Sequence, residues 1–215
     1  MKDIIEVRSI TRTQDGRVSV GVCVENDFGR ERCEFVLLDE LFCELGIQKG
    51  EIDKALLCEM EKFSQVTAAY CSACSSFAYS QSSLRALFRK TLQKGFSREV
   101  CEAAIYIVRS RGFVDEEQIA ARRAELMLDK LWGKSRIIMK LREEGFPDSA
   151  IKAAMDGVCE IDFAENCARL ILKKYRGLPE ERHQSQKMYA ALARYGYSGS
   201  DIKEAVRVLS ERYEN

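Results

Sequence analysis

A repeat with a period of 51 residues limits the folds open to this chain. A glycine followed by an aromatic residue ends three helix-like segments, at Gly95-Phe96, Gly145-Phe146 and Gly196-Tyr197. Behind each stop an apolar residue recurs with a spacing of 51, at Val100, Ile151 and Ile202. Self-similarity at a fixed period is typical of tandem repeats, which bury small apolar faces by stacking and present surfaces to partners.

The residue pattern in the first part of the chain predicts β-strands. Residues 4–10, 18–24 and 33–38 are rich in β-branched and alternating apolar residues, and Asp15-Gly16 between the first two favours a hairpin. Two short helices are expected at 41–45 and 52–60, separated by glycines. We therefore predict a small antiparallel β-rich N-terminal domain with short helices, residues 1–65.

From residue 66 the apolar spacing becomes helical. Separate helices are expected at 66–77, 82–94 and 97–111, and Leu84, Leu87, Phe88 and Leu92 form one helical stripe. The same three-helix pattern follows twice more. We predict a mainly α fold of three tandem three-helix repeats, at 66–114, 115–160 and 161–215.

The net charge of zero hides an uneven distribution. Residues 1–65 hold nine Lys and Arg against fourteen Asp and Glu, whereas residues 81–145 hold fourteen against nine. The front is acidic and the middle basic, which permits contact with nucleic acid without requiring it.

No catalytic constellation is visible, so we expect no enzyme and no cofactor. His183 is the single histidine, which excludes a His-based triad or a two-His metal site within one chain. Nine cysteines are scattered, and Cys71 and Cys74 form the one close pair. Buried or surface thiols, a redox pair and a zinc site all remain open for that pair, with simple thiols favoured. Because no long apolar run or signal peptide is visible, we expect a cytoplasmic protein without membrane contact.

Basic residues at related helix positions are the better functional lead. They predict either ordinary solvated helix faces or a basic track that follows a phosphate backbone or an acidic protein groove. The candidates are Arg85, Arg89, Arg122, Arg123, Lys130, Lys134, Arg136, Lys140, Lys173 and Lys174. Trp132 and the tyrosines, Tyr195 among them, are expected to pack in the core or a groove, with base stacking by Trp132 as the alternative.

The middle of the chain resembles a known family. Gly112-Phe113-Val114-Asp115-Glu116, then Gly133 with Arg136-Ile137 and Leu141, then Gly145-Phe146, Ile151 and Ala154, are similar to the RecX regulatory proteins of bacteria. The resemblance covers residues 66–215 and is most specific at 112–155. The family pattern usually reads Asp-Asp-x-x-Phe-Ala, and Glu116 and Ile119 depart from it here.

The resemblance implies a non-enzymatic negative regulator of the RecA recombinase. Such a protein binds the RecA–single-stranded-DNA filament and inhibits ATP hydrolysis, strand exchange and the co-protease activity that triggers the SOS response. Its repeats would form an elongated, curved body, present as a monomer, that contacts single-stranded DNA directly and weakly. Two other functions remain open: a DNA-binding regulator with a helix-turn-helix-like unit, and a helical-repeat adaptor for other proteins.

Overall fold

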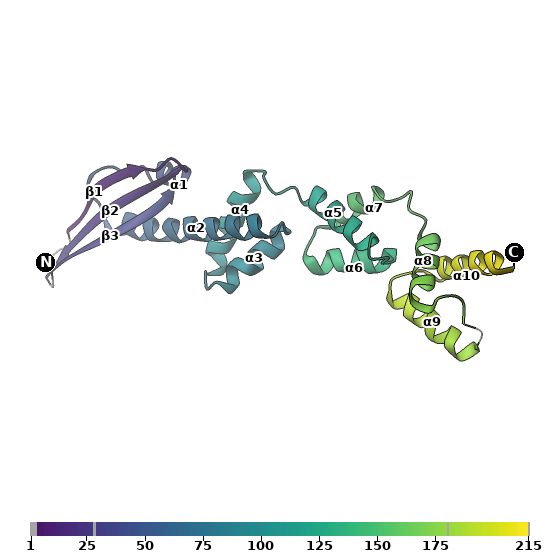
Figure 1. The fold of residues 1–215 in the computed structure, drawn as a ribbon. Coiled ribbons are helices and arrows are strands. Elements are labelled where there is room, and N and C mark those ends of the chain that lie inside the picture. The colour runs from purple at the N-terminus through teal and green to yellow at the C-terminus, as the bar shows by residue number, and fades with distance from the viewer. Residues whose placement is uncertain (1–3, 28, 180, 215) are drawn as a thin grey trace. The chain divides into compact units, whose positions relative to one another are not determined.

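The N-terminal part is an antiparallel sheet. The computed structural model describes residues 4–27, 29–179 and 181–214. Strands β1 (Ile4–Arg12), β2 (Arg17–Asn26) and β3 (Gly29–Leu38) form consecutive hairpins (Figure 1). A two-residue strand, β4 (Gly50–Glu51), extends the sheet in the order β3-β2-β1-β4. The predicted three strands are confirmed, and β4 is an addition, because two residues are too few to leave an alternating pattern.

One face of this sheet is covered by helix. Val18, Val20 and Val22 alternate along β2 and are buried in one apolar cluster with Met60. Met60 belongs to the long helix α2 (Lys54–Tyr79), and a short helix, α1 (Asp39–Leu45), connects β3 to this region. Covering one face of a small sheet removes the apolar side chains of that face from water.

Helix α2 runs without a break through the boundary predicted between the sheet and the first repeat. It has 26 residues, and the side chain of its N-cap residue, Asp53, accepts a hydrogen bond from the Leu56 N–H. The prediction of separate helices at 52–60 and 66–77 is wrong, because no glycine or proline interrupts residues 54–79. Its second half packs against α4 through Val66 and Ala69. The domain boundary at residue 65 stays a prediction.

The remaining helices follow one another along the chain. They are α3 (Leu84–Gln93), α4 (Arg98–Ser110), α5 (Glu116–Leu128), α6 (Lys134–Glu144), α7 (Asp148–Asp156), α8 (Phe163–Tyr175), α9 (Arg182–Arg194) and α10 (Gly199–Glu214). The chain forms two compact units. One comprises the residues up to Gln81 with Leu87–Phe113, and the other comprises Ser82–Ala86 with the residues from Val114 on.

The period of 51 places equivalent residues in equivalent cores. Val100 on α4, Ile151 on α7 and Ile202 on α10 are all buried. Three corresponding helix pairs pack together, namely α2 with α4, α5 with α7 and α8 with α10. The predicted fold class, mainly helical repeats after a small antiparallel sheet, is confirmed. No helix among the described residues is both long and apolar enough to cross a bilayer.

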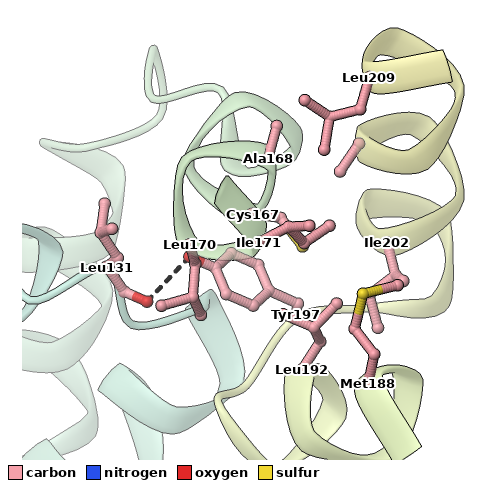
Figure 2. Packing of buried hydrophobic residues seen from close by; sticks show 11 residues of the cluster. Leu131, Cys167, Ala168, Leu170, Ile171, Met188, Leu192, Tyr197, Ile202 and Leu209 are labelled. Carbon is pink, nitrogen blue, oxygen red and sulfur yellow. Dashed lines mark hydrogen bonds between the residues drawn. The ribbon is translucent and has the colours of Figure 1, made fainter. Parts of the chain in front are cut away.

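The core of α8, α9 and α10 is one cluster of buried apolar residues. Cys167 and Ile171 of α8 meet Leu192 of α9 and Ile202 of α10 in one buried cluster (Figure 2). Leu131, which lies before α6, belongs to the same cluster. The cluster therefore extends beyond its own three helices, as expected where neighbouring repeats share a core.

Candidate binding surface

Arg136 and Trp132 form the centre of a cluster of cations and aromatic rings. Trp132 precedes the N-cap residue Gly133 of α6, and Arg136 is the third residue of that helix. Trp132 lies just outside the helix, and its side chain packs against that of Arg136 in the first turn. The Arg136 guanidinium carbon lies 4.0 Å from the centroid of the Trp132 ring, well within cation–π range. Both residues are half-buried.

Tyr195 and Lys174 complete this cation–aromatic cluster. The Arg136 guanidinium carbon is also 5.0 Å from the centroid of Tyr195, the C-cap residue of α9. The Lys174 ammonium, on α8, lies 4.0 Å from the same centroid and donates a hydrogen bond of 2.6 Å to the Tyr195 hydroxyl. That hydrogen bond, helped by the positive charges of Lys174, Arg136 and Lys173, lowers the pKa of Tyr195.

A close contact between two glycines holds this cluster in place. The Gly133 N–H donates to the Tyr195 carbonyl at 2.8 Å, and the Ser135 hydroxyl donates to the Gly196 carbonyl at 2.8 Å. A Cβ on Gly133 would lie 2.2 Å from the Gly196 carbonyl carbon, and one on Gly196 would lie 2.5 Å from the Arg136 Cβ. Only two residues without side chains allow the start of α6 to meet the end of α9 this closely.

We call this contact between the start of one helix and the end of a later one a joint. A similar joint occurs one repeat earlier, without the aromatic rings. The Ser83 hydroxyl donates to the Glu144 carbonyl at 2.7 Å, and a Cβ on Gly145 would lie 3.0 Å from the Arg85 Cβ. Arg85 and Gly145 are each 51 positions before Arg136 and Gly196. The residue 51 positions before Tyr195 is Glu144. The hydrogen bond from a serine at a helix start to a carbonyl at a later helix end is therefore repeated, whereas Gly133, whose counterpart is Ser82, and the cation–aromatic cluster belong to the α6–α9 joint.

The other predicted basic residues have varied surroundings. Arg123 lies 3.9 Å from a Glu144 carboxylate oxygen, and Lys140 lies 3.2 Å from one of Glu143. The remaining predicted side chains are exposed at helix surfaces or turns, namely Arg85, Arg89, Arg122, Lys130, Lys134, Lys173 and Lys174. Of the ten, the structure brings Arg136 and Lys174 together on one ring. A continuous basic track stays a prediction.

The sequence pattern does not place Tyr195 among the candidate site residues. Two features of the sequence could have pointed to it. Tyr195 stands directly before the repeated glycine, and Arg136 stands 51 residues after Arg85, at the matching helix start. Neither signal predicts that rings and cations from three helices meet, since Lys174, Arg136 and Tyr195 are brought together only by the packing of α6, α8 and α9.

Cys71 and Cys74 lie half-buried on α2, and all nine cysteines are free thiols. Arg17 donates to the Cys71 sulfur at 3.8 Å, and burial raises the pKa of Cys74. A raised pKa keeps the Cys74 thiol protonated and slow as a nucleophile. Among the described residues no group of three or more His, Cys, Asp and Glu side chains is arranged to hold a metal ion.

Comparisons with known proteins agree on one family. The family model described as RecX, third three-helix domain, matches residues 160–206. Regulatory protein RecX of Xanthomonas axonopodis pv. citri (strain 306) is 30% identical over 127 residues, which cover 58% of this chain and 77% of that protein. Regulatory protein RecX of Stenotrophomonas maltophilia (strain K279a) is 29% identical over 126 residues, with the same coverage of 58% and 77%.

Solved structures show the same fold. A crystal structure of a regulatory protein RecX matches with a TM-score of 0.73, covering 93% of this chain and 97% of that chain at 22% identity. A crystal structure of RecX from Lactobacillus salivarius matches with a TM-score of 0.58, covering 68% and 97% at 16% identity.

Proposed function

The chain belongs to the RecX family of regulatory proteins, and on that premise we propose that it is a negative regulator of RecA. It binds the RecA–single-stranded-DNA filament and lowers the filament's ATPase, strand-exchange and co-protease activities. Family membership carries this proposal, and the helical-repeat fold supports it, because such folds offer extended surfaces to long partners.

The cation–aromatic cluster is the contact we propose within this function. A guanidinium stacked on rings keeps its in-plane N–H donors available, and these donors match the paired oxygens of a carboxylate or a phosphate. Trp132 and Tyr195 add flat apolar faces beside the charges of Arg136 and Lys174. Such a surface suits both an acidic protein groove and a phosphate backbone.

The other basic residues extend this proposal along the repeats. Arg85, Arg89, Arg122, Arg123, Lys130, Lys134, Lys140 and Lys173 would provide long-range attraction for the same negatively charged filament. Direct binding of single-stranded DNA would be weak and would fall as salt rises, because phosphate contacts release counterions.

The deciding measurement is the RecA ATPase on single-stranded DNA, with and without this protein, at two salt concentrations. We expect inhibition by the wild-type chain, weakened at the higher salt. A triple variant, Lys130→Ala, Arg136→Ala and Lys140→Ala, should inhibit less while remaining folded, as checked by circular dichroism. Full inhibition by the triple variant would reject the basic track, and no inhibition by the wild type would reject the function.

A matched control separates charge at the cluster from charge elsewhere. Arg207 on α10 is exposed and pairs with Glu204 and Glu211. Arg207→Ala removes the same charge as Arg136→Ala, and we expect it to leave inhibition unchanged. Arg136→Lys keeps the charge but loses the planar stacking, so an intermediate loss would assign part of the effect to the rings.

The two other functions would give different results when the same protein is tested. A helix-turn-helix regulator would protect a duplex DNA site from cleavage without RecA. An adaptor for other proteins would leave the RecA ATPase untouched.

A further inference from the structure

A cavity in the N-terminal sheet is lined by arginines from two strands. Its volume is about 250 Å³. The lining includes Arg8 and Ser9 of β1, Gly21 and Cys23 of β2, and Arg30 and Arg32 of β3. None of these residues is among the ten basic candidates of the helical repeats, and they lie in the part of the chain whose net charge is negative.

Two features of the backbone form this cavity, which we call the hollow. The pairing of β1 with β2 shifts between Val7 and Ser9, so Arg8 is the extra residue of a bulge and Ser9 pairs with Gly21. A Cβ on Gly21 would lie 2.4 Å from the Ser9 hydroxyl oxygen. Bulges re-aim side chains, and a glycine within a strand marks a place where another group approaches the backbone.

The hollow opens on the face of β2 that α2 does not cover. Val20 and Val22 belong to the apolar cluster beneath α2. Successive side chains of a strand point to opposite faces, so Gly21 and Cys23 face the other way. Cys23 is nevertheless only 6% exposed, which shows that the side chains around the hollow cover the strand there.

The local charge is positive although the whole segment is acidic. Arg8 pairs with Glu6 at 2.6 Å, and Arg30 pairs with Glu25 at 2.8 Å. The ion pairs of the described residues do not include Arg32. The lining holds three arginines and no carboxylate, and Glu34, which pairs with Gly21 across the strands, accepts a hydrogen bond from Ser19 instead. Both ion pairs are solvent-exposed, and exposed pairs contribute little and exchange readily for a better anion.

We propose that this hollow binds the phosphate group of a phosphate monoester. A monoester carries three terminal oxygens and close to two negative charges, which match three guanidinium groups and the Ser9 hydroxyl. A diester within a nucleic-acid strand offers two terminal oxygens and one charge, and fits this donor set less well. The proposal is independent of RecA, and its test needs neither RecA nor a filament.

The first test is a titration of the ¹⁵N-labelled chain, followed by backbone amide shifts in NMR. The probes are inorganic phosphate and a nucleoside 5′-monophosphate at constant ionic strength. We expect saturable shifts at Ser9, Gly21 and Cys23 with one dissociation constant. Arg32→Ala should weaken binding about tenfold or more, because it removes charge-assisted hydrogen bonds. Arg98→Ala, which removes an exposed arginine of α4 paired with Glu102, should change nothing.

A second pair of variants tests the hollow without changing any charge. In Ser9→Ala the hydroxyl that Gly21 would strike is gone, and the Ser9 Cβ lies 3.7 Å from the Cβ position of Gly21. The double variant Ser9→Ala/Gly21→Ala therefore places a methyl group in the hollow without overlap. Compared with Ser9→Ala alone, it should bind phosphate several-fold more weakly, while circular dichroism confirms that both fold.

The source of the phosphate is decided by two short single-stranded oligonucleotides, one with a 5′-phosphate and one with a 5′-hydroxyl. Tighter binding of the phosphorylated oligonucleotide by about tenfold, lost in Arg32→Ala, would assign the hollow to nucleic-acid ends. Binding of the free phosphate and the monophosphate alone would assign it to small molecules. Equal binding of the two oligonucleotides at Gly21, unsaturable shifts, or an unchanged Arg32→Ala variant would each overturn the proposal.

Discussion

The hydroxyl of Tyr197 donates a buried hydrogen bond of 2.9 Å to the carbonyl of Leu131, across 66 positions of sequence (Figure 2). Leu131 has a left-handed backbone with φ of 57°, which turns the chain between α5 and α6. One phenol thus joins the turn before α6 to the core of α8, α9 and α10. Tyr197 is also the aromatic residue of the third glycine–aromatic stop.

Removal of this hydroxyl should destabilise the protein without leaving a large cavity. In Tyr197→Phe the Leu131 carbonyl stays buried without its partner, and we expect a loss of about 1–3 kcal/mol in the free energy of unfolding. Urea denaturation followed by circular dichroism measures it. Tyr189→Phe on α9, where the side chain is 37% exposed, is the control and should change little. Equal stability of both variants would show that the bond contributes nothing net.

Gly95 and Gly196 separate backbone strain from steric overlap. Both have φ of +93°, but a Cβ on Gly95 meets no atom within 4 Å, whereas one on Gly196 would lie 2.5 Å from the Arg136 nitrogen and Cβ. Gly95→Ala should cost about 1–2 kcal/mol from the left-handed backbone alone. Gly196→Ala should cost about 1–3 kcal/mol more, because the joint must open. Thermal melts of the two variants test the difference, and equal costs would refute the close joint.

Alkaline pH should lower the free energy of unfolding because Cys167 is buried. Burial raises the pKa of this thiol to about 12, from an ordinary value of 9.0. Between these values the unfolded chain releases a proton that the folded chain keeps, so stability is complete below pH 9 and falls as pH rises. Burial shifts the pKa of Tyr197 upward too, which adds to the loss at higher pH.

The urea midpoint measured at pH 8, 9, 10 and 11 checks this alkaline loss. Cys167→Ala should flatten the decrease, although it lowers stability at every pH by removing buried volume. Cys159→Ser, at an exposed thiol, should leave the pH dependence as it is. A midpoint that is constant from pH 8 to pH 11 would contradict the shifted thiol.

Lys174→Met should raise the pKa of Tyr195. The change removes the hydrogen bond to the hydroxyl, which is the main cause of the lowered pKa, and also one positive charge. NMR titration of ¹³C-labelled tyrosine measures the shift. Lys130→Met removes an exposed lysine from the turn after α5 and serves as the control. If both variants leave the Tyr195 titration unchanged, the contact between Lys174 and Tyr195 does not persist in solution.

The periodicity of the sequence predicted the repeats but not the joints. Val100, Ile151 and Ile202 could be aligned because each fills the same position in a local apolar stripe, and local stripes leave a visible spacing. The contact of Gly133 with Gly196 joins residues 63 positions apart and leaves no local pattern. Gly196, which the sequence predicts as the end of a helix, is therefore also a packing residue.

For helix α2 the sequence predicted a break that the structure does not have. Its apolar residues contact the sheet at one end and α4 at the other, so the stripe changes partner along the helix. The two helices expected at 52–60 and 66–77 are one, and residues 54–79 contain no glycine or proline. Of the basic candidates, Arg136 and Lys174 could be named from the sequence, but their shared ring could not, because it depends on the packing of three helices.

The repeated joint makes the repeat array directional. In both joints the start of a middle helix, near Arg85 or Arg136, receives the glycine stop that lies 60 positions further along the chain, at Gly145 or Gly196. The two surfaces differ, and the second repeat contributes both: its helix start near Arg136 to one joint and its glycine stop at Gly145 to the other. Such a contact places no limit on the number of repeats. Chains of this architecture can therefore lengthen or shorten by whole repeats without inventing a new interface.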